Sequence, residues 1–463
     1  MALSDRLADV FDLDAHDTDL QTEVVAGLTT FLTMSYIVVV NPAILVAAID
    51  TGAGDAATMQ MLAVVTALSA GVATLVMAFY ANRPFGLAPG MGLNAFFAFT
   101  VVGAMGIPWE TALAAIVVEG VLFVLLTLVG AREYVIRLFP EPVKFAVGAA
   151  LGLFLAIIGL EKTFIVVADP STLLTLGAVA ADPVALISVL GLFLTFGLYV
   201  RGVTGSIVVG VAVTSVLGWG AAALGVASPH ESVPLAPSLP APTWDVSPLV
   251  GAFLRGFANL DALAFALVVL TFFFVDFLET AGTLVGVGQA GGFLDDDGDL
   301  PEMEKPLMAD AVGTTVGGML GTSTVTTYVE SATGIEEGGR TGLTALVVAF
   351  GFFAAVAFVP FAAAIPQYAS HIALVVVAVL MLGNVAEVDW HDPTHAVPAG
   401  LTVIVMPFTY SIAYGIAAGI VSYPLVKLAA GRVDETRPGH WALAAAFVVY
   451  FYVRTSGVIA GAV

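Results

Sequence analysis

The chain has 463 residues, of which 59% are hydrophobic and 11% charged, and its mean hydropathy is +1.01. Soluble domains carry about 25% charged residues, so this composition excludes a soluble protein and predicts an all-α protein that crosses a membrane many times. The absence of cysteine excludes disulfides and thiolate metal sites, and the net charge of −22 argues against nucleic acid as a partner. We interpret the acidity as the signature of a halophile with a high-salt cytoplasm.

Residues 1–21 form a polar, acidic segment, which we predict to be a cytoplasmic tail rather than a signal peptide, because it lacks a basic start. Nearly all Lys and Arg residues fall in loops on the same side of the predicted membrane as this tail. The positive-inside rule therefore places the N-terminus in the cytoplasm of a multi-pass protein of the plasma membrane.

Apolar segments of spanning length follow in chain order. They are Glu23–Ile49, Met59–Tyr80, Trp109–Val129, Pro142–Leu160, Pro183–Val200, Gly205–Leu224, Leu260–Val287, Leu343–Ala364, Ile372–Leu382, Pro398–Tyr410, Gly415–Leu428 and Trp441–Val453. The last is an extra segment, either a further pass or a helix lying at the interface.

The first of two broken regions between these segments is Pro84–Val102. Its Pro and Gly residues forbid a continuous helix. We expect Phe85–Pro89 to be extended and a half-helix to begin near Met91.

The second broken region covers Pro306–Leu320 and the polar stretch Gly321–Gly334, which carries five hydroxyl side chains and Glu330. The β-branched run Thr324–Tyr328 favours an extended backbone, with a helix restarting near Val329. Non-helical backbone at membrane depth is tolerated only inside protein or along a cavity, so this stretch is a candidate functional site.

Two interrupted segments in corresponding positions indicate inverted repeats with a site at their interface. Gly202–Val216 also resembles Tyr410–Pro424 in its Gly and Ser spacing. We therefore predict about 14 transmembrane segments as two inverted 7-segment halves, Glu23–Leu224 and Leu260–Leu428, with short β-strands in the broken segments 3 and 10.

Two acids lie inside the apolar segment that precedes the second break. Asp276 and Glu279 are three residues apart on a helix and are neighbours on one face, which Thr280 and Thr283 continue. Each carboxylate costs about 2.5–3.5 kcal/mol at the centre of a membrane helix, so both must face protein or water. A buried network that only locks helices together is the alternative to a functional site.

Other polar residues have two interpretations. Asn94 either contributes to the site or joins helices, and Glu119 serves either structural pairing or function. The group His391, His395, Asp389 and Asp392 suggests a metal site, but its Pro-rich loop favours interfacial anchoring. The acidic loop with Asp295, Asp296, Asp297 and Asp299 lacks the Gly and Glu of an EF-hand. We predict no metal site and no cofactor.

Several long motifs resemble the adenine/guanine/hypoxanthine permease branch of the nucleobase–cation symporter-2 (nucleobase–ascorbate transporter) family. They are GLTTFLTMSYIVVVNPAIL, GLAPGMGLNAFFAFTVV, VDFLETAGTLVGVG, GTSTVTTYVESATGIEEGGRTG and MPFTYSIAYGIAAG. The resemblance implies a core domain and a gate domain, antiparallel strands that meet near mid-membrane, and a homodimer. The implied boundaries are core 22–135 and 258–366, gate 136–225 and 367–430, an external linker 226–257 and an extra segment 431–463.

The resemblance also assigns residues. Asp276 takes the place of the family's acid on the eighth helix that hydrogen-bonds the base. Glu279 takes the place of a second acid on the same helix. Glu330 takes the place of a carboxylate or amide on the tenth helix that also hydrogen-bonds the base. Asn94 matches an asparagine of the third helix. Ser331 departs from the family pattern, because many relatives have Asn there.

The chemistry suits a purine nucleobase, whose N–H donors a carboxylate accepts and whose ring nitrogens peptide N–H groups can reach. We predict substrate contacts from Asp276, Glu330, Asn94, Phe272, Phe273 and Thr327. Phe272, Phe273, Phe96 or Phe97 could stack on the base. Glu279, Asp276 and Glu330 are the candidates for proton coupling. The prediction is a secondary transporter that imports purines with H⁺, or with Na⁺, as its core domain slides against its gate domain.

Other functions fit less well. A uracil or xanthine permease has the same architecture, and an inorganic anion transporter requires a cationic site that these broken segments lack. An enzyme with a carboxylate pair is disfavoured, because Asp276 and Glu279 lie on one helix whereas such dyads converge from separate elements. A channel needs a continuous pore.

Overall fold

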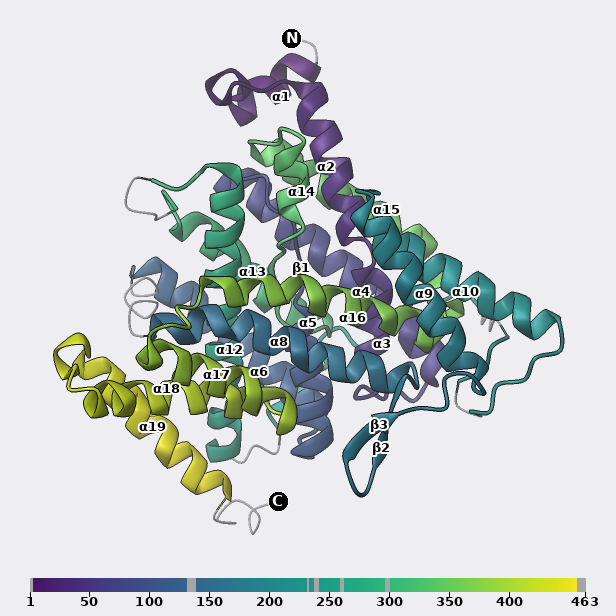
Figure 1. Cartoon of the computed structure of the whole chain (residues 1–463). Coiled ribbons are helices and arrows are strands. Elements are labelled where there is room, and N and C mark those ends of the chain that lie inside the picture. Colours follow the sequence, from purple (N-terminus) through teal and green to yellow (C-terminus); the bar gives the residue numbers. More distant parts are fainter. Residues whose placement is uncertain are drawn as a thin grey trace.

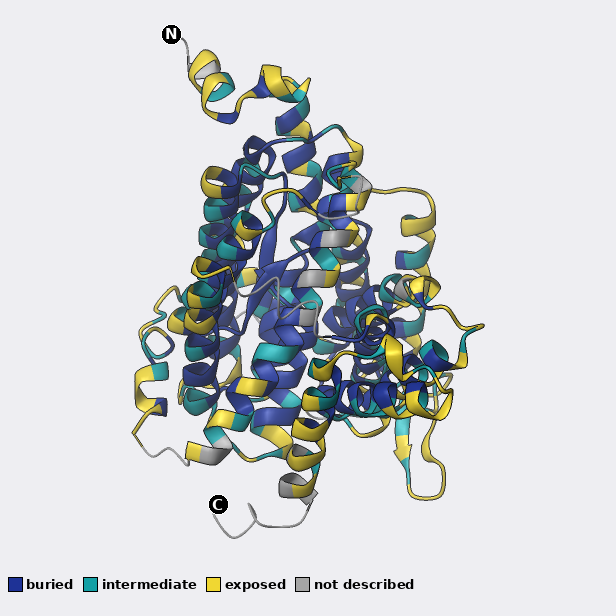
Figure 2. Ribbon diagram, turned by 90° about the vertical axis from the view of Figure 1, so that its left-hand side faces the viewer, coloured by how far each residue is buried: buried dark blue, intermediate teal, exposed yellow. Residues whose placement is uncertain are grey.

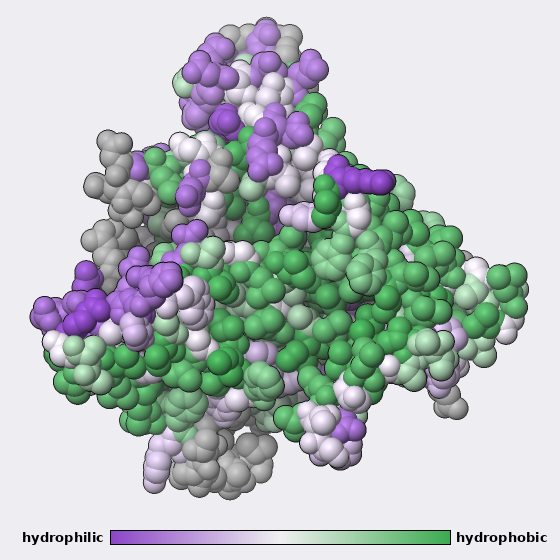
Figure 3. Space-filling model, viewed as in Figure 1, coloured by the Kyte–Doolittle hydropathy of each residue, from purple (hydrophilic) through white to green (hydrophobic). Residues whose placement is uncertain are grey.

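The computed structural model describes residues 3–130, 139–230, 233–236, 241–258, 262–295 and 300–455. Within these residues ten helices are long and apolar enough to cross a membrane, and three further apolar helices are shorter. The helices form one packed body with an almost wholly buried interior, and the N-terminal helix α1 projects from one end (Figures 1 and 2). Apolar side chains cover a broad part of the outer face, whereas polar ones gather at α1 and near α18 and α19 (Figure 3). The prediction of a polytopic helical protein is confirmed.

The described elements of the first half are α1 (Leu3–Phe11), η1 (Leu13–His16), α2 (Leu20–Met34), α3 (Ile37–Leu45), α4 (Asp55–Val76), η2 (Met77–Ala81), β1 (Leu87–Pro89), α5 (Met91–Ala95), η3 (Phe96–Ala104), α6 (Trp109–Leu128), α8 (Glu141–Lys162), β2 (Val166–Asp169), β3 (Leu173–Leu176), α9 (Pro183–Val200) and α10 (Ser206–Ala223).

Those of the second half are α11 (Phe253–Gly256), α12 (Ala262–Gly291), α13 (Glu304–Leu320), β4 (Val325–Thr327), α14 (Ser331–Glu336), α15 (Gly342–Ala355), η4 (Val356–Ala364), α16 (Gln367–Met381), η5 (Leu382–Glu387), α17 (Pro393–Phe408), α18 (Ile412–Ala429), η6 (Val433–Glu435) and α19 (Pro438–Thr455). In each half a strand and a short helix follow two long helical segments. The predicted number of fourteen crossings stays a prediction.

Both predicted breaks contain a strand. β1 lies within the stretch predicted to be extended and α5 begins at Met91, while β4 lies within Thr324–Tyr328 and α14 begins at Ser331. The two strands pair antiparallel, with Leu87 opposite Thr327 and Pro89 opposite Val325.

The prediction that Pro306–Leu320 is broken is wrong, because these residues belong to the continuous helix α13. Pro306 stands in the first turn of α13, where a proline is tolerated because that turn's N–H groups have no intrahelical acceptor. The break is therefore confined to the residues after Gly321, whose φ of 95° ends the helix in the left-handed region.

The long helices form two groups around the paired strands. In one group α6 packs on α13, α2 on α15, and α4 on both α13 and α15. In the other, α8 packs on α16 and α17, and α17 on α18, so that these helices cross the front of the first group (Figure 1). The two groups meet where α16 packs on α3, and α12 also packs on α8.

The loop before α17 uses its acids for capping and ion pairing. Asp392 accepts a hydrogen bond from the Thr394 backbone N–H at 2.8 Å and pairs with Arg432 at 2.7 Å. These partners hold the pKa of Asp392 well below its ordinary value. Among the described residues no cluster of His and acids could hold a metal ion. Asp296, Asp297 and Asp299 of the acidic loop lie outside the described residues.

The extra C-terminal segment forms α19, which packs against α18. The Phe447 ring lies 5.4 Å from that of Phe274 in α12. The two interpretations of α19, a further pass or a helix lying at the interface, remain predictions.

Candidate functional site

The β1–β4 ribbon is held from outside by side chains of the surrounding helices. Thr74 of α4 accepts a hydrogen bond from Leu87 N at 3.0 Å and lies 3.1 Å from Leu87 O. Thr314 of α13 donates to Val325 O at 2.9 Å, and Asp310 accepts from Thr327 N at 3.2 Å. At these positions the peptide groups of the strands are already satisfied by helix side chains and are not available to a ligand.

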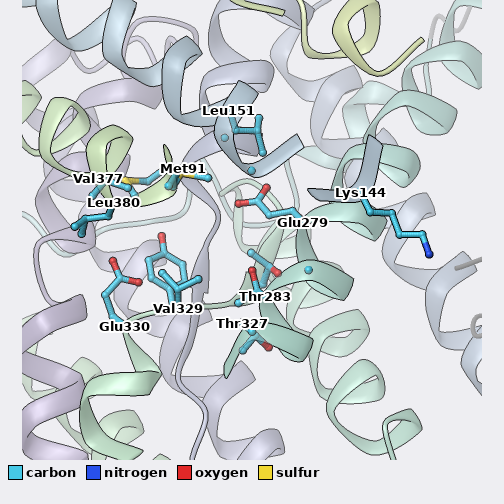
Figure 4. A pocket seen from close by; sticks show the side chains of 17 residues that line it. Met91, Lys144, Leu151, Glu279, Thr283, Thr327, Val329, Glu330, Val377 and Leu380 are labelled. Carbon is cyan, nitrogen blue, oxygen red and sulfur yellow. The ribbon is translucent and has the colours of Figure 1, made fainter. Parts of the chain in front are cut away.

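A cavity of about 200 Å³ lies beside this ribbon, between the two groups of helices (Figure 4). Its walls come from α5, α12 and β4 on one side and from α8 and α16 on the other. The lining residues are Met91, Gly92, Lys144, Gly148, Leu151, Glu279, Gly282, Thr283, Gly286, Thr326, Thr327, Tyr328, Val329, Glu330, Val377, Leu380 and Met381. The volume suits a ligand smaller than drug-sized molecules.

Glu279 projects into this cavity from α12 (Figure 4). Its Oε2 atom is buried and has no hydrogen-bond partner among the described residues, and the same holds for the Thr327 hydroxyl. Two glycines bring the backbone of α5 close to the carboxyl group: a Cβ at Gly90 or at Gly92 would lie 3.4 Å from a Glu279 oxygen. Buried polar atoms without partners are rare in proteins, which makes this wall a candidate binding surface for a polar ligand.

Glu330 reaches the cavity from the end of the second break (Figure 4). The Tyr36 hydroxyl donates to Glu330 Oε1 at 2.6 Å and fixes the carboxyl group. The neighbouring Tyr328 lines the cavity, and its hydroxyl donates to Pro89 O at 2.5 Å. The Lys144 side chain extends away from Glu279 (Figure 4), so the centre of the cavity is acidic rather than cationic.

Asp276 lies outside the cavity lining and is fully buried behind it. Thr280 Oγ1 lies 3.0 Å from Asp276 Oδ1, 3.1 Å from Asp310 Oδ2 and 2.9 Å from Thr326 Oγ1. Of the two acids on α12, the structure thus places Glu279 at the cavity and Asp276 in a second layer.

The other predicted site residues lie elsewhere. Asn94 is buried in α5, where it accepts from the Ser323 hydroxyl and donates to Pro89 O at 3.4 Å, an arrangement that joins the two breaks. Phe272 packs edge-on against Phe96, with 5.0 Å between ring centres, and Phe273 stacks on Phe123 at 4.6 Å. Neither phenylalanine lines the cavity in this conformation.

Sequence reasoning missed Asp310, Tyr328 and Lys144. Asp310 is the only acid of α13 beyond its first turn, and this was a signal, since ionisable residues inside membrane helices are expensive. The apolar wall from α8 and α16 (Leu151, Val377, Leu380 and Met381) carries no sequence signal, because such residues resemble any helix core. Ser331, which departs from the family pattern, accepts from Gly86 N at 3.0 Å and does not line the cavity.

The sequence profile of a family described as the Permease family matches residues 21–418. The chain belongs to this family. The permease is 40% identical to the adenine permease AdeP of Escherichia coli over 430 residues, covering 93% of this chain and 92% of AdeP. It is 37% identical to the guanine/hypoxanthine permease PbuO of Bacillus subtilis over 449 residues, covering 96% of this chain and 99% of PbuO. The resemblance stated from the motifs is confirmed.

The fold of the permease is also that of a solved transporter. The transmembrane domain of the cyanobacterial bicarbonate transporter BicA matches 86% of this chain and 97% of its own length, with a TM-score of 0.58 and 15% identity. At this identity the likeness concerns the fold alone.

The hydrogen bond from Tyr36 to Glu330 gives a first prediction. We expect Tyr36→Phe to raise the KM of the permease for its substrate about tenfold, because the Glu330 carboxyl loses the donor that orients it. Initial rates of labelled substrate uptake measure this change. Tyr199→Phe is the matched control, since Tyr199 is exposed on α9. An unchanged KM in Tyr36→Phe would contradict the assigned role.

Proposed function

We propose that this permease is a secondary active importer of purine nucleobases, with adenine, guanine and hypoxanthine as the candidate substrates. One observation carries the proposal: the Glu279 and Thr327 oxygens are buried and without partners in the described structure, beside a cavity that also receives Glu330. The names of the relatives AdeP and PbuO support a purine.

The lining matches the chemistry of a base. Carboxyl oxygens of Glu279 and Glu330 accept hydrogen bonds from ring and exocyclic N–H groups, and the Thr327 hydroxyl can donate to a ring nitrogen. The Tyr328 ring provides the aromatic surface predicted from Phe272 and Phe273. We assign the main acid of α12 to Glu279 rather than Asp276, because only Glu279 reaches the cavity.

The cavity wall suggests how the substrate moves. The α5, α12 and β4 side belongs to the proposed core domain (22–135 and 258–366), and the α8 and α16 side to the proposed gate domain (136–225 and 367–430). Sliding of the core against the gate, as in an elevator, would carry the base across a plasma membrane with the N-terminus in the cytoplasm. A homodimer through the gate domains and coupling to H⁺, or to Na⁺ in a salt-adapted cell, complete the proposal.

Uptake into proteoliposomes tests the function. Labelled adenine, guanine and hypoxanthine are offered with an acid-outside pH gradient, with and without Na⁺, against unlabelled uracil and xanthine as competitors. We expect saturable purine uptake that Glu330→Ala abolishes. Uptake of uracil or xanthine in preference to the purines would favour the alternative permease function, and insensitivity to Glu330→Ala would refute the site.

A further inference from the structure

The cavity is closed at one end and open at the other. At the closed end, Leu151 of α8 and Thr327 of β4 are buried. At the open end, Gly282 and Gly286 of α12 are exposed and Lys144 of α8 is half-buried. A ligand held at the closed end can therefore leave past the two glycines without a change in the closed end.

Gly282 and Gly286 continue the face of α12 on which Glu279 lies. Residues three, four and seven positions apart share one side of a helix. Thr283 belongs to the same side and lines the cavity between the two glycines. With a rise of about 1.5 Å per residue, Gly286 lies about 10 Å from Glu279 along the helix axis. We call this side of α12, from Glu279 to Gly286, the glycine face.

Packing against neighbouring helices does not explain the two glycines. Glycine weakens a helix interior relative to alanine, so its presence needs a compensating reason. At Gly152 of α8 the reason is close packing, because an added Cβ would lie 2.9 Å from the Ala378 carbonyl oxygen of α16. At Gly282 and Gly286, by contrast, nothing in the described structure outside the helix's own backbone lies within 4 Å of the Cβ position. Their missing side chains leave open space beside α12.

The open end lies toward the side of the N-terminal segment. Leu284 and Val287, in the last turns of α12, belong to one hydrophobic cluster with Phe11 and Leu13. α8 begins at the exposed Glu141, so the first turn of α8 reaches the surface of the helix bundle. In the proposed orientation this side is the cytoplasm.

Toward the opposite side the path ends in packed side chains. Phe154, almost one turn beyond Leu151 in α8, is fully buried. Val275 and Phe272, which precede Glu279 in α12, are fully buried as well. A base therefore has no room to pass there in this conformation.

Polar atoms at the closed end indicate that the path starts from a ligand site. Thr327 is 2% exposed and lines the cavity, and its hydroxyl oxygen has no partner among the described residues. Glu279 Oε2 is also buried and without a described partner. Both observations are independent of the glycines and concern the end of the cavity from which a ligand would depart.

We infer that the base leaves the cavity to the cytoplasm along the glycine face of α12, and that Gly282 and Gly286 set the width of this route. The inference rests on the proposed function. A purine is flat and rigid, so a side chain at either glycine narrows the route without touching the Glu279 carboxyl group. Lys144 directs its amino group away from Glu279 (Figure 4), which leaves the stem of its side chain along the route.

The chain contains no cysteine, so a single introduced thiol reports on its own surroundings. Full-length Gly286→Cys is treated with a charged, membrane-impermeant methanethiosulfonate in inside-out and in right-side-out membrane vesicles. We expect faster modification in the inside-out vesicles, and slower modification there when hypoxanthine is present. Gly197→Cys is the matched control, because Gly197 is exposed on α9 and does not line the cavity, so hypoxanthine should leave its modification rate unchanged.

Modification that is equally fast or faster in right-side-out vesicles overturns the inference. So does a lack of protection by hypoxanthine while the wild type transports hypoxanthine. If Gly286→Cys does not insert, Gly282→Cys replaces it with the same expectations. Failure of the wild type to transport any purine would instead overturn the proposed function, and the modification rates would still decide to which side the cavity opens.

A size series tests the width of the route. We expect Gly286→Leu to lose hypoxanthine uptake, and Gly286→Ala to keep part of it, while both keep the unfolding temperature of the wild type or exceed it, since both residues favour a helix over glycine. Wild-type uptake by Gly286→Leu overturns the assigned width. Lost uptake together with a lower unfolding temperature overturns it too, because Gly286 would then serve packing.

Discussion

Replacement of Glu279 by Gln is expected to weaken the binding of purines to the cavity strongly. The Glu279 carboxyl is the acceptor on α12 that faces the cavity and has no other partner in the described structure. A hydrogen bond to a charged group contributes about 1.5–3 kcal/mol, so the apparent affinity should fall about 10- to 150-fold.

Competition by unlabelled hypoxanthine measures this affinity in the same proteoliposomes. Glu110→Gln is the control for loss of one negative charge, because Glu110 lies near the exposed Arg255 and does not line the cavity. An affinity in Glu279→Gln that equals the wild type would show that the base does not touch this carboxyl group. If Glu279→Gln keeps the wild-type affinity and Asp276→Asn loses it, the carboxyl group that binds the base is that of Asp276.

Replacement of Gly342 by Ala is expected to destabilise the helix packing around the ribbon. Gly342 begins α15 against η2, and an added Cβ would lie 2.0 Å from the Ala78 carbonyl oxygen. Because this neighbour is backbone, the two elements must move apart, and overpacking of this kind costs about 1–3 kcal/mol. The unfolding temperature of the detergent-solubilised protein should fall, and uptake with it, since η2 leads into β1.

Gly197→Ala is the matched control for this substitution. No heavy atom lies within 4 Å of the Cβ position at Gly197 in α9. Alanine favours helix over glycine by up to about 1 kcal/mol, so this variant should be as stable as the wild type or more so. Equal unfolding temperatures for the two variants would contradict the close approach at Gly342.

The two breaks were predictable from sequence because their signals are local. Pro84, Gly86 and Pro89 forbid a helix, and the β-branched residues before Tyr328 favour an extended backbone. The error at Pro306 was local as well: a proline excludes a helix interior but is compatible with a first turn, and the sequence did not mark Glu304 as the start of α13.

The rotation of a helix could not be predicted in the same way. Asp276 and Glu279 are separated by less than one turn, so the pattern brings both to one face without deciding which acid reaches the cavity. That choice depends on how α12 packs against α6, α8 and the ribbon. For the same reason Phe272 and Phe273 were expected at the base although both pack into neighbouring helices.

The pairing of β1 with β4 also constrains how the protein is made. Leu87 and Thr327 are partners although 240 residues separate them (327 − 87), so the first strand is synthesised long before the second. Until residue 327 leaves the ribosome, β1 has no strand to pair with. The lipid bilayer around it contains no water to hydrogen-bond its free peptide groups. Closure of the ribbon must therefore be a late step in biogenesis. We expect an N-terminal fragment that ends before α12 to be degraded when expressed alone, and to be rescued by co-expression of the remaining chain.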